Sequence, residues 1–426
     1  MKRSTLFLSA LITSFSLQAQ WQLTGNAGTN PTTHFIGTTD NVPLKFRVNN
    51  IPMGSLSQYA IFFGANSGIS NTGNYNAGFG WYALYSNSSG YLNTGIGCAA
   101  LYYNSTGQSN TATGYNALGS NTAGNYNTGF GLQAIWGNTT GHYNTGVGTY
   151  ALNGNSTGYS NTAIGFSACY YSSYRHNNVA VGDSALSSGF GTTPSSIEGS
   201  YNTAVGSHSL VNNTTGYLNT AVGYRSLSSI TTGNYNTAIG YNAYPVNGTV
   251  SNYTGIGYNV GSSSSVSNSV EIGNSSVTWI GGQVGWSTYS DKRIKENIRE
   301  DVKGLDFIMK LKPVTYNLNI HKQSEMTRSV KDAEKATDWN GKYVIESKRI
   351  TGFVAQDVEE AAKQAGYDFD GVTKPETPGG LYSLRYSEFV VPLVKAVQEQ
   401  QQMIDKLEQR IKELEKKIAS CAQVNL

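Results

Sequence analysis

A short phrase repeats through the middle of the chain at a fixed spacing. Its copies read YNAGFG, LNTGIG, YNTGFG, SNTAIG and close variants, and each ends in glycine. These glycines stand 17 residues apart from Gly80 to Gly182, and again from Gly206 to Gly257 after a seven-residue insertion. A last copy ends at Gly273 after 16 residues, and a degraded first copy ends at Gly64. A fixed short period is typical of a solenoid, in which each repeat forms one coil.

The repeat itself indicates what a coil contains. Seventeen residues are too few for a pair of helices and suit two short strands joined by two turns. The N-T-A-V-G part alternates small or aliphatic residues with polar ones, as a half-buried strand does. An Ala-Leu pair and an N-T-T-G turn complete the coil. We expect a mainly β protein, a parallel β-solenoid whose coils, roughly a dozen at about 4.8 Å spacing, form a rod about 60 Å long.

Charged residues are almost absent from the repeats. Between residues 71 and 286 they are Arg175, Asp183, Glu198, Arg225 and Glu271. Glycoside hydrolysis normally needs two neighbouring carboxylates, so three scattered acidic residues argue against a carbohydrate-active rod. A site assembled between chains stays open. The repeated aspartates that bind calcium in other β-rolls are also absent.

The uncharged polar residues of the repeats indicate structural roles. The repeated asparagines predict ladders that cap the turns. His142, His176 and His208 occur singly at different phases of the repeat, so we expect no metal site and no cofactor. The many Tyr, Asn, Ser and Thr side chains leave a cell-surface glycan or a host receptor as a hypothetical partner.

Other global features limit the partners further. A net charge of +3 is too small to indicate nucleic acid or an anionic membrane surface. Cys98, Cys169 and Cys421 are too widely spaced for a disulfide framework or a metal site, so they read as unpaired thiols.

The N-terminus has the pattern of a secretory signal. Residues 1–19 combine Lys2 and Arg3 with a short apolar run and small residues near Ala19, which predicts cleavage there and export to the extracellular space or the cell surface. The run is too short to span a bilayer, and a short buried helix is the alternative. Residues 20–58 read as a strand-rich cap in which an Asn-Val-Pro turn joins two alternating runs, and residues 59–285 as the solenoid.

From residue 287 onward lie 45 of the 55 charged residues, and the pattern becomes that of an α+β domain, residues 286–390. The spacing predicts a helix in 302–311, ended by Pro313, and a strand in VTYNLNI. The polar segment 323–342 reads as an inserted loop. A strand in RITGFVAQ, a helix in DVEEAAKQAG that ends at Gly366, and a strand in GGLYSLRYSEF follow.

The last segment, residues 391–420, predicts a coiled coil. Apolar residues alternate four-three spacing, with isoleucine at the a positions and leucine at the d positions. This pattern favours two strands, but the polar Gln400 at a d position leaves the number open. An amphipathic helix packed on its own domain is the alternative. The seam comprises Leu393, Val397, Gln400, Ile404, Leu407, Ile411, Leu414 and Ile418.

Ser290 and Lys295 stand at the boundary between rod and domain. A serine at the head of a charged segment is most often a helix N-cap. A serine can also act as a nucleophile when a base takes its proton, and a lysine can be that base when burial or neighbouring cations lower its pKa. Lys292 and Arg293 supply nearby positive charge. The spacing alone does not decide between the two roles.

A family resemblance favours the second role. SDKRIKENI, LDFIMKLKPVTYN, GFVAQDVEEA and YSLRYSEFVVPLVKAVQEQ, within about residues 288–400, closely resemble the C-terminal intramolecular chaperone domain of phage endosialidases and tailspikes. That family is an autocatalytic serine peptidase and is shared with the myelin regulatory factor. Its S-D-x-R-x-K motif implies Ser290 as nucleophile and Lys295 as general base, with Asp291, Arg293 and Asn297 also matching. The segment 323–342 departs from the pattern as an insertion.

The resemblance implies self-cleavage beside Ser290 after three chains associate, with no external substrate. The repeats also resemble the NSVAIG-type coils in trimeric autotransporter adhesin heads, although those coils are shorter. An exported homotrimeric fibre matured by its own Ser-Lys domain is thus the leading hypothesis. The alternatives are an adhesin whose C-terminal domain trimerises without cleaving, and a tailspike-like carbohydrate-active enzyme.

Overall fold

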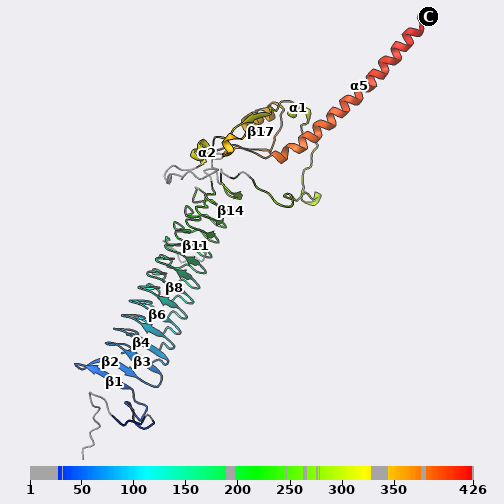
Figure 1. The fold of residues 1–426 in the computed structure, drawn as a ribbon. Helices are drawn as coiled ribbons and strands as arrows, with labels where there is room; N and C mark the ends of the chain where they lie inside the picture. Colours follow the sequence, from blue (N-terminus) through cyan, green and yellow to red (C-terminus); the bar gives the residue numbers. More distant parts are fainter. Residues whose placement is uncertain are drawn as a thin grey trace, which may run out of the picture.

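The structure is a computed structural model that describes residues 27–30, 32–188, 197–245, 247–261, 266–274, 277, 279–327, 344–375 and 380–424. It consists of a long solenoid, a small α+β region and a long C-terminal helix (Figure 1). The predicted signal peptide and most of the polar segment 323–342 lie outside the described residues.

The repeats form a parallel β-solenoid, as predicted. Each strand pairs in parallel with the strand of the next coil. Paired residues are usually 17 positions apart in the sequence, so that Thr128 faces Thr145 and Gly129 faces Gly146. The seven-residue insertion lies between β10 and β11, where Val179 faces Thr203 without loss of register. The strands are β3 Ala60–Phe63, β4 Asn76–Phe79, β5 Thr94–Ile96, β6 Thr111–Thr113, β7 Thr128–Phe130, β8 Thr145–Val147, β9 Thr162–Ile164, β10 Val179–Val181, β11 Thr203–Val205, β12 Thr220–Val222, β13 Thr237–Ile239, β14 Tyr253–Ile256 and β15 Ser269–Ile272.

The glycine that ends each repeat forms a column along the rod. Gly131 has φ of 135°, and a Cβ there would lie 2.6 Å from the carbonyl oxygen of Gly148 in the next coil. The same close approach recurs at each column glycine from Gly64 to Gly240, which confirms the degraded first copy. Only glycine combines this backbone conformation with so close an approach between coils. The 17-residue glycine period is therefore a steric requirement of the stacking.

Each described coil contains one strand, and the expectation of two strands was wrong. The Ala-Leu part is a turn in which Ala99 and Leu101 have φ of 56° and 54°. These left-handed residues recur at the same positions in the other coils and cannot extend a β-ladder. Their side chains still turn inward: Ala100 and Leu101 are fully buried, and equivalent pairs form the apolar core.

Buried asparagines form two ladders along the rod, as the sequence predicts. In one ladder, the backbone N–H of Asn110 donates to Asn93 Oδ1 at 3.0 Å, while Asn110 Nδ2 donates to Gly124 O at 2.8 Å. In the other, Asn121 Nδ2 donates to Asn104 Oδ1 at 2.7 Å. These bonds satisfy polar groups that would be costly to bury unpaired. The asparagines thus stabilise the turns from inside the coil.

The N-terminal cap is an antiparallel hairpin of β1 (Leu44–Val48) and β2 (Ile51–Leu56), and β2 then pairs with β3. The predicted Asn-Val-Pro turn was wrong, because the chain reverses at Asn49 and Asn50. Both have positive φ, 46° and 65°, as a two-residue hairpin turn requires. The second predicted run forms β1, but the first run, around Phe35 and Ile36, forms no strand, so that part of the expectation was also wrong.

The α+β region packs around aromatic side chains. Phe307 is fully buried, with ring centroids 4.9 Å from Phe369 and 6.5 Å from Phe389. The region comprises α1 Leu305–Ile308, β16 Val314–Tyr316, α2 Ile320–Thr327, α3 Val344–Ser347, β17 Ile350–Gly352, α4 Ala355–Gln364, β18 Val372–Thr373, β19 Ser383–Leu384 and η3 Tyr386–Phe389. The described start of the segment read as an inserted loop, residues 323–327, belongs to α2, so this part of that expectation was wrong.

The helix α5 (Val390–Val424) begins against the α+β region and then extends away from it (Figure 1). Its first turns pack on α1, where Glu399 Oε2 accepts a 2.8 Å hydrogen bond from the N–H of Leu305. From Leu393 to Ile418, every residue of the predicted seam is exposed. The seam is therefore not packed on its own domain. No helix among the described residues is long and apolar enough to cross a membrane.

Candidate active site

The Ser-Lys motif lies in the connection between β15 and α1. Every residue from Trp279 to Asp301 is exposed. The large side chains around the motif share this exposure, and Trp286 and Tyr289 are 91% and 94% exposed. Apolar groups of this size are rarely left in water without a partner surface. The single chain presents this segment without covering it.

A carboxylate-guanidinium pair shapes the turn that carries the motif. Asp291 caps the short helix η1 (Lys292–Ile294), because its Oδ1 accepts from the N–H of Arg293 at 2.8 Å. The guanidinium of Arg293 also donates to both carboxylate oxygens, with Nη2 2.7 Å from Oδ2 and Nε 3.1 Å from Oδ1. These hydrogen bonds lower the pKa of Asp291 and raise the pKa of Arg293. The pair holds the turn closed.

The turn brings Ser290 and Lys295 into direct contact. Lys295 Nζ lies 2.6 Å from Ser290 Oγ and donates a hydrogen bond to it. The helix cap is Asp291, so the structure does not give Ser290 the N-cap role that composition alone favours. Asn297 takes part through its backbone, whose φ of 53° turns the chain after Lys295.

This contact has the geometry that nucleophilic catalysis requires. A nucleophile and its base must lie within hydrogen-bond distance, about 2.6–3.2 Å. As an ammonium, Lys295 donates to the hydroxyl, whereas the neutral amine at the same place would accept the hydroxyl proton. A lysine becomes an effective base when it is removed from water. The single chain supplies the contact, and its exposure leaves that removal to another surface.

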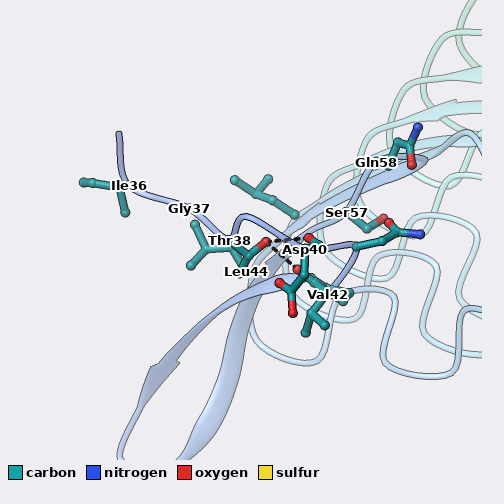
Figure 2. A pocket seen from close by; sticks show the side chains of 11 residues that line it. Ile36, Gly37, Thr38, Asp40, Val42, Leu44, Ser57 and Gln58 are labelled. Carbon is teal, nitrogen blue, oxygen red and sulfur yellow. Dashed lines mark hydrogen bonds between the residues drawn. The ribbon is translucent and has the colours of Figure 1, made fainter. Parts of the chain in front are cut away.

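A hollow lies at the N-terminal end of the rod. It has a volume of about 420 Å³ and is lined by the loop from Ile36 to Leu44 and by the end of β2. Figure 2 shows Thr38 beside Asp40 and Val42, where its Oγ1 donates to both backbone carbonyls, at 3.2 and 2.8 Å. Among its described lining residues, Asp40 is the one charged side chain. None of these described lining residues forms a nucleophile–base pair.

The three cysteines are not paired with one another, and the described His, Cys, Asp and Glu side chains do not cluster. Cys169 is buried, and its burial raises the pKa of the thiol to about 11. Cys98 is half-buried and Cys421 exposed, and all three are free. The described residues include no group of three His, Cys, Asp or Glu side chains placed to hold a metal ion.

These features define a β-solenoid protein with a C-terminal domain that carries a Ser-Lys contact. Comparison with known families matches residues 290–367 to the peptidase family described as Chaperone of endosialidase. The matched part begins at Ser290, includes Lys295 and extends past α4. The family consists of self-cleaving intramolecular chaperone domains, so the expected resemblance of this region is confirmed.

No curated protein and no solved structure matches the chain. The likeness of the repeats to autotransporter adhesin heads therefore stays a prediction.

Proposed function

We propose that this protein is an exported trimeric fibre whose C-terminal domain assembles three chains and then cleaves itself off beside Ser290. The observation that carries the proposal is the 2.6 Å contact between Lys295 Nζ and Ser290 Oγ, inside the region that matches a self-cleaving family. Chaperone domains of this family usually act in trimers.

The proposed reaction is an acyl transfer within one chain. Lys295, as the neutral amine, takes the proton of Ser290, and the serine oxygen attacks the carbonyl carbon of an adjoining peptide bond. An ester forms, the carbon–nitrogen bond breaks, and the proton passes from Lys295 to the leaving nitrogen. Water then hydrolyses the ester. Asp291 and Arg293 act as positioning residues, because they hold the turn and do not touch the reacting atoms.

Assembly provides the surface that the single chain lacks. The seam of α5 and the segment around Ser290 are both exposed, and association would bury apolar side chains in each. Removal of water from Lys295 would then favour its neutral form. Cleavage would thus follow assembly and would not precede it.

Cleavage gives the fibre kinetic stability. Parallel β-pairing folds slowly and exposes strand edges, so an attached assembly domain assists it. Once the C-terminal third is released, the rod has lost its means of reassembly and stays trapped in the folded state.

The purified full-length chain tests the proposal on a denaturing gel. We expect two fragments separated near residue 290 in the wild type, and one intact chain in Ser290→Ala and in Lys295→Ala. Lys292→Ala is the matched control, because it removes an exposed lysine of the same turn that does not contact Ser290. The fragment masses show which peptide bond beside Ser290 is cut. An intact wild-type chain would overturn self-cleavage and leave a trimerising adhesin.

Export and surface binding belong to the same proposal. Tyr126 and Tyr143, which lie away from the column glycines, stack on one another along the rod, with ring centroids 5.1 Å apart. Because the ring faces cover each other, a glycan would meet their edges and hydroxyl groups. Binding of the released rod to a glycan array, with hydrolysis of bound glycans as a second readout, separates an adhesin from an enzyme.

A further inference from the structure

The residue before each column glycine points out of the coil. The middle residue of a strand, such as Ala163, is fully buried, so its neighbours Thr162 and Ile164 face outward. Because the strands stack in register, the last outward residue of each coil lines up with that of the next. We call this set the outer column: Phe63, Phe79, Ile96, Thr113, Phe130, Val147, Ile164, Val181, Val205, Val222, Ile239, Ile256 and Ile272.

The outer column is apolar, and its members are exposed or half-buried along the rod. All of its members except Thr113 are aliphatic or aromatic, and none is charged. Phe130 is 57% exposed, Ile239 45% and Ile164 42%. The residue after the glycine widens the stripe with further large side chains such as Trp81 and Phe166. Continuous apolar stripes of this length mark a surface that binds another protein.

About half a coil after each column glycine, the exposed residues are polar and not apolar. There the N-T-T-G segments present serine and threonine, including Thr140, Thr157 and Thr232. The coil is therefore amphipathic in cross-section, with one apolar side and one hydroxyl-rich side. Solubility alone would favour hydroxyl groups on both sides.

The spacing of the outer column identifies its partner. A surface that contacts every member must present apolar groups at the spacing of the coils, and a parallel, in-register copy of the same rod does so. In such an arrangement each residue lies near its own equivalents, so a charge in the column would meet an identical charge. The rod's charged residues, Arg175, Asp183, Glu198, Arg225 and Glu271, all lie outside the outer column, and Asp183 alone occupies the flanking position after a column glycine.

We propose that the outer column is the surface along which three copies of the rod pack against one another, parallel and in register. The inference rests on the homotrimer proposed above and adds that the contact runs the length of the solenoid. The α5 seam sets the parallel register, and the outer column continues the association through the repeats. The hydroxyl-rich side then faces outward from the trimer.

Thiol cross-linking of the full-length chain tests this arrangement. Ile164→Cys and Thr157→Cys are each made in a Ser290→Ala, Cys98→Ser, Cys421→Ser background, which removes the accessible thiols. Cys169 stays, because it is buried and its raised pKa keeps it unreactive. With a short bismaleimide, we expect a cross-linked dimer of chains at Ile164→Cys and none at Thr157→Cys. Adding Ile239→Lys to the first variant should cause loss of the cross-link, whereas Thr232→Lys should leave it.

The outcomes separate this inference from the proposed function. A chain that is trimeric by light scattering but does not cross-link at Ile164→Cys has rods that stand apart, which overturns the inference and leaves the self-cleaving trimer intact. Equal cross-linking at both positions overturns the assignment of the face. A monomeric chain overturns both the inference and the homotrimer.

Discussion

Lys295 Nζ and Ser290 Oγ are 2.6 Å apart, although five residues separate them in the chain. The turn between them is closed by Asp291 and Arg293, so neither reactive side chain depends on the packed core for its position. The pair is preformed but exposed to water. This combination suits a site that is assembled early and becomes active when another copy covers it.

Lys295→Arg tests whether the amine acts as a base. Arginine keeps the positive charge and can still donate to Ser290, but it does not lose its proton in proteins. We expect loss of the two fragments on a denaturing gel, with the fold preserved by circular dichroism. Lys292→Arg should cleave like the wild type. Cleavage of Lys295→Arg at the wild-type rate would contradict a base role for Lys295.

Asp291→Asn and Arg293→Gln test the positioning role of the pair. Either change loosens the turn without removing the nucleophile or the base, and a misplacement of about 1 Å costs up to about a hundredfold in rate. We expect slower appearance of the fragments in a time course, with the same fragment masses. Arg293→Lys should recover part of the rate. Complete loss in both variants would instead indicate a direct chemical role.

The same pair gives a pH signature. Hydrogen bonds from Arg293 lower the pKa of Asp291 below its usual value. The contribution of this pair to the turn is therefore complete above the ordinary carboxyl pKa and is lost as the pH falls through the lowered folded-state pKa. Carboxyl titration by NMR in the Ser290→Ala chain should show this low value, and Arg293→Gln should return it toward normal. An unchanged value in Arg293→Gln would show that the pair does not form in solution.

Gly131→Ala tests the glycine column. The new Cβ would meet the Gly148 carbonyl, and alanine at φ of 135° adds strain of about 1–3 kcal/mol. We expect a clear fall in the melting temperature measured by circular dichroism. Gly129→Ala is the matched control two residues earlier, because the equivalent position in the preceding coil is Ala112. Equal effects of the two changes would argue against a special role for the column.

Asn121→Ala tests the second asparagine ladder. The change leaves Asn104 Oδ1 without the donor at 2.7 Å and should cost about 1–3 kcal/mol, the penalty of a buried unpaired polar group. The chain already contains one buried asparagine oxygen of this ladder without a donor. Asn213 Oδ1 has no partner among the described residues, because the equivalent residue of the next coil is Ile230 and not asparagine. Asn74→Ala, at an exposed position, should change the melting temperature little. A larger fall in melting temperature for Asn74→Ala than for Asn121→Ala would rule out the ladder as a source of stability.

Cys421 tests the orientation of the coiled coil. It follows Ile418 by three residues, which continues the seam to the next d position, and it is exposed in the single chain. A parallel, in-register assembly would bring Cys421 of neighbouring chains together, so mild oxidation should yield disulfide-linked dimers. In Cys421→Ser with Lys416→Cys, the thiol lies on the outer side and should not cross-link. Failure of the native thiol to cross-link would exclude a parallel, in-register helix assembly.

The repeats and the coiled-coil seam were predictable because their information is local and periodic. Each coil contacts only its neighbours, so the 17-residue spacing, the glycine column and the buried Ala-Leu pairs appear directly as a pattern in the sequence. The four-three spacing of the seam is likewise local. The periodic pattern did not reveal that the Ala-Leu part is a turn, because left-handed φ at Leu101 follows from closing a coil of 17 residues and not from leucine's own preference.

For the candidate site too, the sequence determined one part and the tertiary structure the other. The sequence by itself determined that Ser290 and Lys295 share one short motif, and the family resemblance suggested what they do. Only the tertiary structure decided that Asp291, not Ser290, caps the turn, and that the amine reaches the hydroxyl. It also decided that the site and most of the outer column are exposed in one chain. The physical reason is that hydrogen-bond distances and exposure depend on how side chains meet in space, which residue spacing alone leaves open.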